Sequence, residues 1–277
     1  MRPYQNLDET MYKAVFLDMD GTLLRKDHTI SDVTKKAIQD LLNKGIIIVP
    51  ISARPLHGIL PITQNVFPES IPVVSLNGGY ILHNKEIIWQ TDIALSEAAF
   101  IHHELENFDV AVMYYCRMEW YATVDRTEVK KEQRITQVKI KIQPFEHSMK
   151  EWHANKSGPN KILIAGDKEL IIDIEKRLLE LHEGKFNIYK SQPRYLEIMN
   201  LKASKAGAVQ FLAAKYGIQQ NEIVAIGDNY NDKGMIEYAG MGVAMGNAPD
   251  EIKAAANYVT DTNNNDGVAK ALAHFFK

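Results

Sequence analysis

The sequence predicts an α/β protein in which a Rossmann-like parallel sheet forms the core and a second, α+β domain is inserted into it. The first observation is that unbroken apolar runs alternate with amphipathic helical segments in the first and last thirds of the 277-residue chain. Such runs are typical of parallel strands that are buried on both faces. The second observation is that the middle third alternates polar with apolar residues and is rich in aromatics, which indicates a sheet with one exposed face.

The composition is that of a globular protein and argues against several classes of function. A formal net charge of −3 argues against non-specific binding of nucleic acid or of anionic membranes. Cys116 is the single cysteine, so we expect a buried structural thiol and no intramolecular disulfide. The N-terminus has no apolar run of the signal-peptide kind, and no segment approaches the roughly 20 apolar residues that span a bilayer. We therefore expect a cytoplasmic protein.

The first third of the chain predicts buried strands joined by a helix. Residues 1–11 are polar, and we expect them to form a loosely held lead-in. A helix is predicted over residues 31–43, because Ser31 is a suitable N-cap and the apolar residues after it share one face. The predicted strands are residues 12–17, 46–51 and 71–76.

The inserted α+β domain is predicted over residues 83–192, where the apolar pattern changes. Its predicted elements are strands at 87–89, 109–115 and 119–124, helices at about 95–107 and 168–182, and a surface loop at 147–159.

The parallel pattern returns in the last third, so residues 1–82 and 193–277 are predicted to form one core domain. Because strands of an open parallel sheet end at a common crevice, reactive side chains are expected where these strands end. The predicted elements are a strand at 194–198, a helix at 204–216, strands at 222–226, 242–245 and 258–260, and a helix after Gly267.

The first strand ends in Asp18-Met19-Asp20-Gly21-Thr22, which places two carboxylates two residues apart. Two carboxylates at this spacing can take separate roles in phosphoryl transfer. Asp18 would attack phosphorus, and Asp20 would protonate the leaving oxygen and later activate water. Gly21 permits the tight backbone path of such a turn, and exposed amides there can meet phosphate oxygens.

Two further segments carry groups that suit a phosphate. Ser52 follows the second strand and offers a hydroxyl, with nearby amides, to the phosphate oxygens that are not transferred. Arg54 comes two residues later, and an arginine at a strand end could pair with a surface carboxylate. Lys205, near the start of a helix, is suited to neutralise charge on the nucleophile and the phosphate.

The fourth segment is GDNYND at 227–232, directly after an apolar strand. Carboxylates that cluster near a phosphate repel one another, so a hard cation with oxygen ligands is needed. Mg²⁺ fits, because it is commonly held by one or two carboxylates together with substrate phosphates. It would orient the phosphate and offset charge in the transition state. Asp232 could instead simply cap the helix that follows.

In order and separation, four segments resemble the motifs of the haloacid dehalogenase-like (HAD) hydrolase superfamily: DMDGTLL, the Ser of ISARP, the Lys of KASKAG, and GDNYND. NGG at 77–79 and the tail VAMGNAPDEIKAAANYVTDTNNNDGVA resemble its Cof-type phosphatases, which carry a large α/β cap between motifs two and three. The resemblance spans nearly the whole chain after the first ten residues and is weakest in the cap. It implies Mg²⁺-dependent hydrolysis of small phosphorylated metabolites such as sugar phosphates, with a cap that chooses the substrate.

The resemblance also implies a role for each matching residue. Asp18 would be the nucleophile and a metal ligand, and Asp20 the acid/base, which ligates the metal through its backbone carbonyl. Asp228 would be a further metal ligand, and Asp232 would support the metal site. The residues expected to contact phosphate or substrate are Met19, Thr22, Ser52, Ala53, Arg54, Lys205 and Asn231.

Two other functions stay open at this point. A phosphomutase-type phosphotransferase shares the nucleophile and a similar cap, but it returns the phosphoryl group to a sugar hydroxyl instead of water. A non-catalytic sensor of a phosphorylated ligand is a different class of protein. Loss of an essential carboxylate would favour a sensor, and all of these carboxylates are present.

Overall fold

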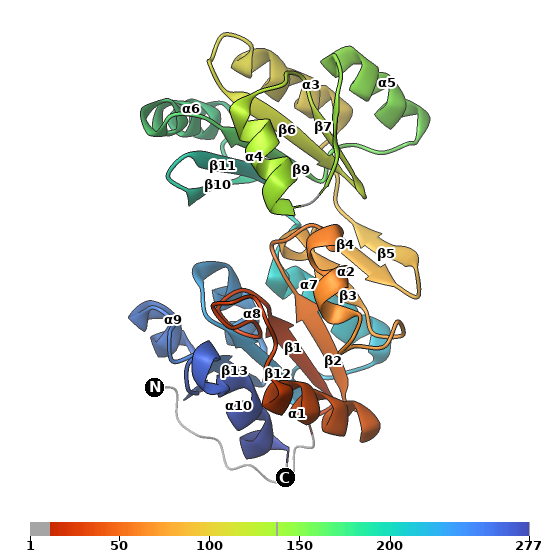
Figure 1. Ribbon diagram of the computed structural model, residues 1–277, viewed down its shortest axis with the longest axis vertical. Helices are drawn as coiled ribbons and strands as arrows, with labels where there is room; N and C mark the ends of the chain where they lie inside the picture. Colours follow the sequence, from red (N-terminus) through yellow and green to blue (C-terminus); the bar gives the residue numbers. More distant parts are fainter. Residues whose placement is uncertain (1–11, 137, 277) are drawn as a thin grey trace. The chain divides into compact units, whose positions relative to one another are not determined.

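The computed structural model describes residues 12–136 and 138–276 and divides into two compact units (Figure 1). Unit 1 is formed by Met1–Ile88 together with Ser204–Lys277, and unit 2 is formed by Trp89–Ala203. The predicted α/β class is confirmed, because unit 1 holds a largely parallel sheet and unit 2 a mostly antiparallel sheet with helices. The predicted lead-in over residues 1–11 lies outside the described residues. Every helix within the described ranges is too short or too polar to span a bilayer.

An eight-stranded sheet in the order β14-β13-β12-β1-β2-β3-β4-β5 forms the centre of unit 1. The strands from β14 to β3 pair in parallel, and β4 pairs antiparallel with β3. The strands are β1 (Ala14–Asp18), β2 (Ile47–Ile51), β3 (Val73–Ser75), β4 (Tyr80–His83), β5 (Glu86–Gln90), β12 (Ile223–Gly227), β13 (Met241–Ala244) and β14 (Tyr258–Val259). The helices are α1 (Asp32–Asn43), α2 (Leu60–Thr63), α7 (Lys205–Tyr216), α8 (Lys233–Tyr238), α9 (Asp250–Ala255) and α10 (Gly267–Phe275).

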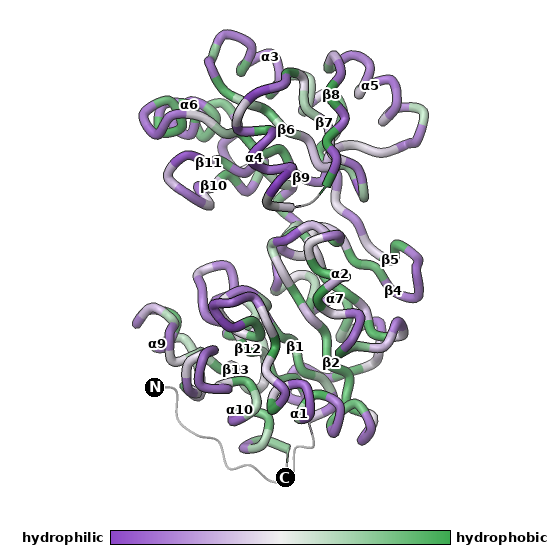
Figure 2. Tube along the Cα trace, in the orientation of Figure 1, coloured by the Kyte–Doolittle hydropathy of each residue, from purple (hydrophilic) through white to green (hydrophobic). Residues whose placement is uncertain are grey.

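The central strands of unit 1 are covered on both faces. Every residue of β1 and β12 is buried, and Figure 2 shows these strands as hydrophobic segments. Helix α1 packs against α10, and α7 packs against α8. Ser31 caps α1 by accepting a hydrogen bond from the Thr34 N–H at 3.1 Å, so the predicted N-cap is confirmed. The continuous apolar runs of the sequence therefore reflect burial between two layers of helices.

The parallel register brings the predicted reactive segments to one edge of this sheet. Strands β1, β2, β12 and β13 run in the same direction, so their carboxyl ends meet. Asp18 pairs with Ile51, the residue before Ser52, and β12 ends at Gly227, the residue before Asp228. The fold therefore places the first, second and fourth segments side by side.

Unit 2 is built on a six-stranded sheet in the order β10-β11-β9-β6-β7-β8. Its neighbouring strands are antiparallel except for β7 and β8, which are parallel. The strands are β6 (Ala111–Cys116), β7 (Glu119–Ala122), β8 (Ile140–Ile142), β9 (Lys161–Ala165), β10 (Phe186–Gln192) and β11 (Tyr195–Asn200). The helices are α3 (Leu95–Leu105), α4 (Thr127–Thr136), α5 (Phe145–Ala154) and α6 (Lys168–Leu181).

Helices α3, α5 and α6 share one apolar core with one face of the unit 2 sheet. Trp152 of α5 is fully buried in this core, and Tyr114 of β6 lies beside it with ring centroids 5.4 Å apart. Cys116 belongs to the same core, and burial raises the pKa of its thiol to about 11. A thiol with this pKa is protonated at neutral pH and a poor nucleophile. The prediction of a buried structural cysteine is confirmed.

Both predicted domain boundaries are wrong in position. Unit 1 continues to Ile88 and not to residue 82, because β4 turns back on β3 and extends the core sheet. Unit 2 ends at Ala203 and not at residue 192, because β11 pairs antiparallel with β9 and β10. Strand β11 lies inside the unit 2 sheet and is buried along most of its length. Its apolar run therefore resembles that of a core parallel strand.

The surface loop predicted at 147–159 is also wrong, because α5 occupies much of that segment. Phe145, Ser148 and Trp152 are buried on one face of this helix, at spacings of three and four residues. Most of the positions between them are polar, and buried Ser148 is itself polar, which conceals this helical period in the sequence. Helix α4 carries the basic run around Lys130 and was likewise not predicted as a helix.

A buried amide ties together three segments of unit 2. Asn160 is fully buried, and its Nδ2 donates to the Thr91 carbonyl at 3.0 Å and to Asp92 Oδ1 at 2.7 Å. Its Oδ1 accepts a hydrogen bond from the Arg117 N–H at 2.6 Å. The segment that enters unit 2 after β5 is thereby fastened to the turn between β6 and β7.

We expect Asn160→Ala to lower the free energy of unfolding by about 3 kcal/mol, because it leaves buried polar groups unpaired at about 1–3 kcal/mol each. The matched control is Asn155→Ala, at the exposed end of α5, which should change stability by less than about 0.5 kcal/mol. Urea unfolding followed by circular dichroism measures both. An Asn160→Ala variant as stable as the unmodified protein would contradict this assignment.

Candidate active site

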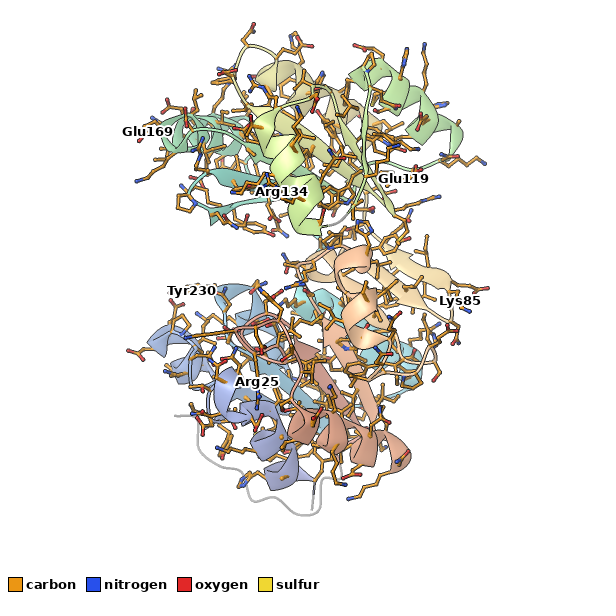
Figure 3. The ribbon with its side chains drawn as sticks, in the orientation of Figure 1. Arg25, Lys85, Glu119, Arg134, Glu169 and Tyr230 are labelled. Carbon is orange, nitrogen blue, oxygen red and sulfur yellow. The ribbon has the colours of Figure 1, made fainter. Side chains whose placement is uncertain are left out.

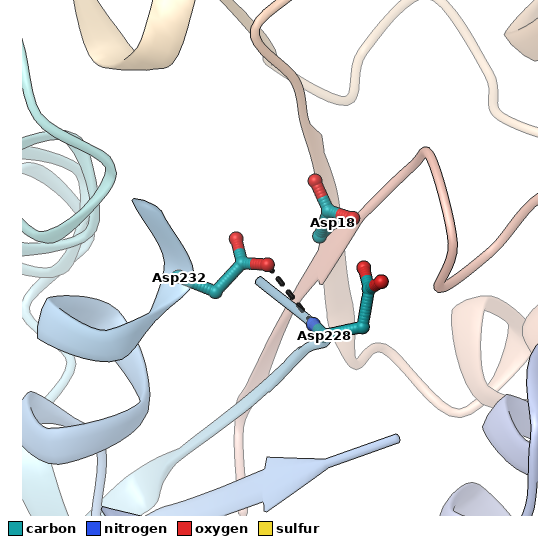
Figure 4. Close-up of side chains that lie close together, drawn as sticks. All are labelled: Asp18, Asp228 and Asp232. Carbon is teal, nitrogen blue, oxygen red and sulfur yellow. Dashed lines mark hydrogen bonds between the residues drawn. The ribbon is translucent and has the colours of Figure 1, made fainter. Parts of the chain in front are cut away.

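Three carboxylates converge at the carboxyl edge of the unit 1 sheet (Figure 4). Asp18 ends β1, and Asp228 and Asp232 lie in the turn after β12. One carboxylate oxygen from each residue lies within 4.8 Å of the other two. Asp18 and Asp232 are buried, whereas Asp228 is half-buried. Like charges at this separation repel one another and require positive charge nearby.

Lys205 supplies positive charge to this cluster. It is the first residue of α7, and Ser204 caps the helix by accepting a hydrogen bond from the Gly207 N–H at 3.0 Å. Only 1% of the Lys205 side chain is exposed, and its Nζ donates to Oδ1 of Asp18 and to Oδ1 of Asp232. Burial lowers the pKa of Lys205, but the two carboxylates outweigh burial, and the pKa lies above its usual value. Lys205 is therefore a buried, charged ammonium.

Asp232 organises the turn that carries Asp228. Its Oδ2 accepts hydrogen bonds from the backbone N–H groups of Asp228 and Asn229, both at 3.0 Å, and Figure 4 shows the first of them. Its Oδ1 is taken by Lys205. In the part of the chain that the structure describes, Asp232 makes no side-chain capping bond to α8, so simple capping does not explain this residue.

The Asp228 carboxylate packs directly against the turn after β1. Thr22 Oγ1 donates to Oδ1 of Asp228 at 3.0 Å. Gly21 has a φ of +82°, and a Cβ added there would lie 2.2 Å from Oδ2 of Asp228. Glycine is required at position 21 for both reasons, because it adopts the left-handed backbone and leaves room for the carboxylate.

The crowding of charge changes the pKa values at this site. Burial, and then the charge of Asp232, raises the pKa of Asp18 well above its usual range, against the opposing charge of Lys205. Burial and the charge of Asp232 also raise the pKa of Asp228 to about 6, although the hydrogen bond from Thr22 opposes the shift. Both shifts therefore reflect burial first and the repulsion between the carboxylates second.

Asp20 is not part of this cluster and is paired with Arg54. Arg54 Nε donates to Oδ2 of Asp20 at 2.7 Å, and Arg54 Nη2 donates to Oδ1 at 2.6 Å. The Asp20 side chain is 47% exposed, in contrast to buried Asp18. The Arg54 carbonyl accepts hydrogen bonds from the Leu76 N–H at 3.1 Å and from Ser75 Oγ at 3.0 Å. The carboxylate that pairs with Arg54 is therefore that of Asp20, the predicted acid/base.

The other predicted phosphate contacts lie where the first two strands end. Ser52 is buried, and its Oγ accepts a hydrogen bond from the Arg54 N–H at 3.1 Å. Ala53 is half-buried between them. The Met19 side chain is fully buried, so the backbone is the part of this residue that can face a ligand. Contact of these residues with phosphate stays a prediction.

Two asparagines at this edge, Asn77 and Asn247, were not predicted as site residues. Asn231 Nδ2 donates to Oδ1 of Asn77 at 3.0 Å, which joins the NGG segment to the turn after β12. Asn247 Nδ2 donates to the Gly21 carbonyl at 2.9 Å. Asn77 follows β3 and Asn247 follows β13, so their positions after predicted strands were the available signal.

The donor set fits a hard divalent cation. Carboxylate oxygens are the ligands that such cations prefer, and Asp18 and Asp228 bring theirs within 4.8 Å of each other. Lys205 pairs with two of the three clustered carboxylates, so a bound cation would offset the remaining negative charge.

We expect Lys205→Met to lower the free energy of unfolding at pH 7 by about 3–5 kcal/mol, because it leaves two buried carboxylates without their ammonium. Protonation of Asp18, whose pKa is already raised by burial and by the charge of Asp232, relieves the repulsion, so the deficit should shrink as the pH falls. Urea unfolding in chelator at pH 7 and pH 5 measures both effects. Lys215→Met, at an exposed position of the same helix, is the control. An equal deficit at both pH values would contradict the electrostatic explanation.

Comparison with known proteins identifies the family. The haloacid dehalogenase-like hydrolase model matches residues 15–272. A Haemophilus influenzae protein, named as a phosphatase with no substrate specified, is 43% identical over 269 residues, which are 96% of this chain and 99% of that protein. The 5-amino-6-(5-phospho-D-ribitylamino)uracil phosphatase YcsE of Bacillus subtilis is 33% identical over 270 residues, 95% of each protein.

Solved structures agree with these relatives. A haloacid dehalogenase-like hydrolase from Bacteroides thetaiotaomicron superposes with a TM-score of 0.86 at 31% identity, over 96% of this chain and 100% of that one. A structure described as a HAD subclass IIB sugar phosphatase superposes with a TM-score of 0.79 at 27% identity, over 95% and 98% of the two chains. The chain therefore belongs to the haloacid dehalogenase-like hydrolases and, among them, to the Cof-type phosphatases, which hydrolyse phosphoric monoesters.

Proposed function

We propose that this phosphatase hydrolyses small phosphorylated metabolites, sugar phosphates foremost, in a Mg²⁺-dependent reaction that passes through a phospho-aspartate on Asp18. The observation that carries the proposal is the Asp18 carboxylate, which is buried at the end of β1, bonded to Lys205 and adjacent to Asp228. A carboxylate that is oriented by a fixed ammonium at the carboxyl edge of a parallel sheet is suited to nucleophilic attack.

In the first step, an oxygen of Asp18 forms a bond to phosphorus as the bond from phosphorus to the leaving oxygen breaks. Lys205 keeps Asp18 oriented and offsets charge on the phosphoryl group. Asp20 gives a proton to the leaving oxygen. In the second step, Asp20 accepts a proton from water, the water oxygen bonds to phosphorus, and the bond to Asp18 breaks. Asp20 is therefore protonated at the end of the cycle, as it was at the start.

Arg54 has a supporting role in this proposal. Its bidentate bond holds the exposed Asp20 carboxylate at the rim of the site, apart from the buried Asp18. Arg54 is also a suitable partner for a substrate phosphate, because guanidinium groups bind phosphate and carboxylate with the same geometry. A substrate phosphate would then compete with Asp20 for Arg54 and release Asp20 for proton transfer.

Mg²⁺ is the cation that we propose for the carboxylate cluster. Asp18 and Asp228 would hold it through carboxylate oxygens, and Asp20 through its backbone carbonyl. Asp232 would support the site without ligating, because its oxygens are already bonded to Lys205 and to backbone N–H groups. When bound, Mg²⁺ orients the phosphate and offsets its charge.

The proposed substrate class follows from the named relatives. One relative is named for a phosphorylated ribityl compound, and one structural neighbour is described as a sugar phosphatase. Both names specify a phosphate on a small polar metabolite. Unit 1 holds all of the predicted reactive groups, so we propose that unit 2 selects the leaving group. A cytoplasmic location stays a prediction.

We expect phosphate release from some of a panel of sugar and polyol phosphates in Mg²⁺, and none in chelator. Asp18→Asn should abolish turnover, and Asp20→Asn should lower kcat by about 10²–10⁴-fold. Asp40→Asn, at an exposed position of α1, is the matched control and should keep full activity. Mass spectrometry of rapidly quenched enzyme should find one phosphoryl group, which Asp18→Asn lacks.

Other results of this experiment point to the other two functions. Transfer of phosphate to a sugar hydroxyl, without free phosphate, would indicate a phosphomutase-type phosphotransferase. Saturable binding of a phosphorylated compound by folded protein, with no turnover in Mg²⁺, would indicate a sensor. An Asp18→Asn variant with normal turnover would refute the covalent mechanism itself.

We expect Mg²⁺ affinity to fall by at least about tenfold between pH 7 and pH 5, because metal binding requires ionised Asp228 and its pKa is about 6. The direction follows from the raised pKa: the ligand is ionised above pH 6 and protonated below it. Isothermal titration calorimetry of metal-free protein measures the affinity, and buffers of different ionisation enthalpy should show proton release on binding near pH 6. An affinity that does not change over this range would contradict the assignment of Asp228 as a ligand.

A further inference from the structure

Asn247 bridges two segments of the active site from a third. It lies in the loop after β13, and its side chain is exposed. Its Nδ2 donates to the Gly21 carbonyl at 2.9 Å and to Oδ2 of Asp228 at 3.2 Å. Its Oδ1 accepts a hydrogen bond from the Asn263 N–H at 3.0 Å. One amide thus joins the turn after β1, the turn after β12 and the loop after β14.

The chemistry of these contacts sets the orientation of the Asn247 amide. Two oxygens, from Gly21 and Asp228, face one end of the amide, and a backbone N–H faces the other. The NH₂ group must therefore point to the oxygens, because the opposite orientation would place three acceptors together and leave the N–H facing another donor.

Asn247 completes the support of the Asp228 carboxylate. Thr22 donates to Oδ1 at 3.0 Å, and Asn247 donates to Oδ2 at 3.2 Å. Both donors are neutral, so they orient the carboxylate without cancelling the charge that a cation needs. Partners of this kind hold metal ligands in place, and their loss commonly costs 10–100-fold in metal affinity.

The loop after β14 also fastens the segment that follows Thr22, independently of Asn247. Asn264 Oδ1 accepts a hydrogen bond from the Lys26 N–H at 3.1 Å. Arg25, which is labelled in Figure 3, donates to Asp266 at 2.7 Å. These contacts touch neither Gly21 nor Asp228, so Asn264 is a matched asparagine without the bridge.

We propose that Asn247 is a positioning residue that fixes the Asp228 carboxylate for the metal and locks it to the turn that carries Asp20. The proposal rests on the proposed function, because it assigns to Asp228 the role of a metal ligand. Asn247 acts through Asp228 and Gly21 and touches no reacting atom. Its loss should therefore weaken metal binding first and leave substrate binding by the metal-loaded enzyme unchanged.

The test compares Mg²⁺ binding by the metal-free full chain, measured by isothermal titration calorimetry at pH 7.5, for three variants. Asn247→Ala removes the amide, and Asn247→Leu removes it while keeping a similar volume. Each should weaken the Mg²⁺ Kd by about 10-fold or more. Asn264→Ala should stay within about twofold of the unmodified protein, as expected of a surface change away from the ligands. At saturating Mg²⁺, the substrate KM of all three should match the unmodified enzyme.

Thermal unfolding in chelator shows that each variant is folded and separates positioning from stability. Folded Asn247 variants that bind Mg²⁺ as tightly as the unmodified protein would overturn the proposal. An equal loss in Asn264→Ala would also overturn it, because the loop as a whole and not the bridge would then matter. If the unmodified protein itself binds no Mg²⁺, the proposed function fails, and the calorimetry of that protein alone reveals it.

Discussion

The buried ammonium of Lys205, held between Asp18 and Asp232, is the interaction on which the site depends. Removing an ammonium from water costs several kcal/mol, and carboxylates in good geometry must offset that cost. Lys205 has two such partners. Asp18 is the last residue of β1, and Asp232 lies between β12 and α8. The ion triad therefore joins β1, β12 and α7 at one point. Its charges do not balance once Asp228 is included, and burial together with the repulsion between carboxylates raises the pKa values of Asp18 and Asp228.

The surrounding structure orients these charges with neutral groups. Backbone N–H groups occupy one oxygen of Asp232, and Thr22 and Asn247 bond to the two oxygens of Asp228. Donors of this kind are positioned before any ligand arrives, so little reorganisation is needed when charge develops on a phosphate. The exposed Asp20–Arg54 pair differs in kind, because solvent reaches it and its partners can exchange. The site thus combines a rigid buried part with an adaptable rim.

Much of this could be predicted from local patterns. Unbroken apolar strands that end in carboxylates predicted a parallel sheet and placed Asp18, Asp228 and Lys205 correctly at one edge. Contacts that depend on tertiary geometry could not be predicted. One example is the ion pair between Arg54 and Asp20. The boundary at β11 was missed because an interior antiparallel strand is as apolar as a core parallel strand. The contacts of Asn247 could not be predicted, because a single asparagine in a loop belongs to no periodic pattern.

Unit 1 is made from the two ends of the chain, and this governs when the site can exist. Asp18 and Lys205 are 187 positions apart, and Thr22 and Asp228 are 206 apart, whereas unit 2 is one continuous segment. Contacts between such distant residues carry a large loop-closure entropy. During synthesis, β1 emerges long before its neighbour β12. The apolar residues of β1 therefore lack some of their native packing partners until β12 has been synthesised. Unit 2 is complete before α7 leaves the ribosome. The carboxylate cluster can therefore form only after the chain has been synthesised through Asp232.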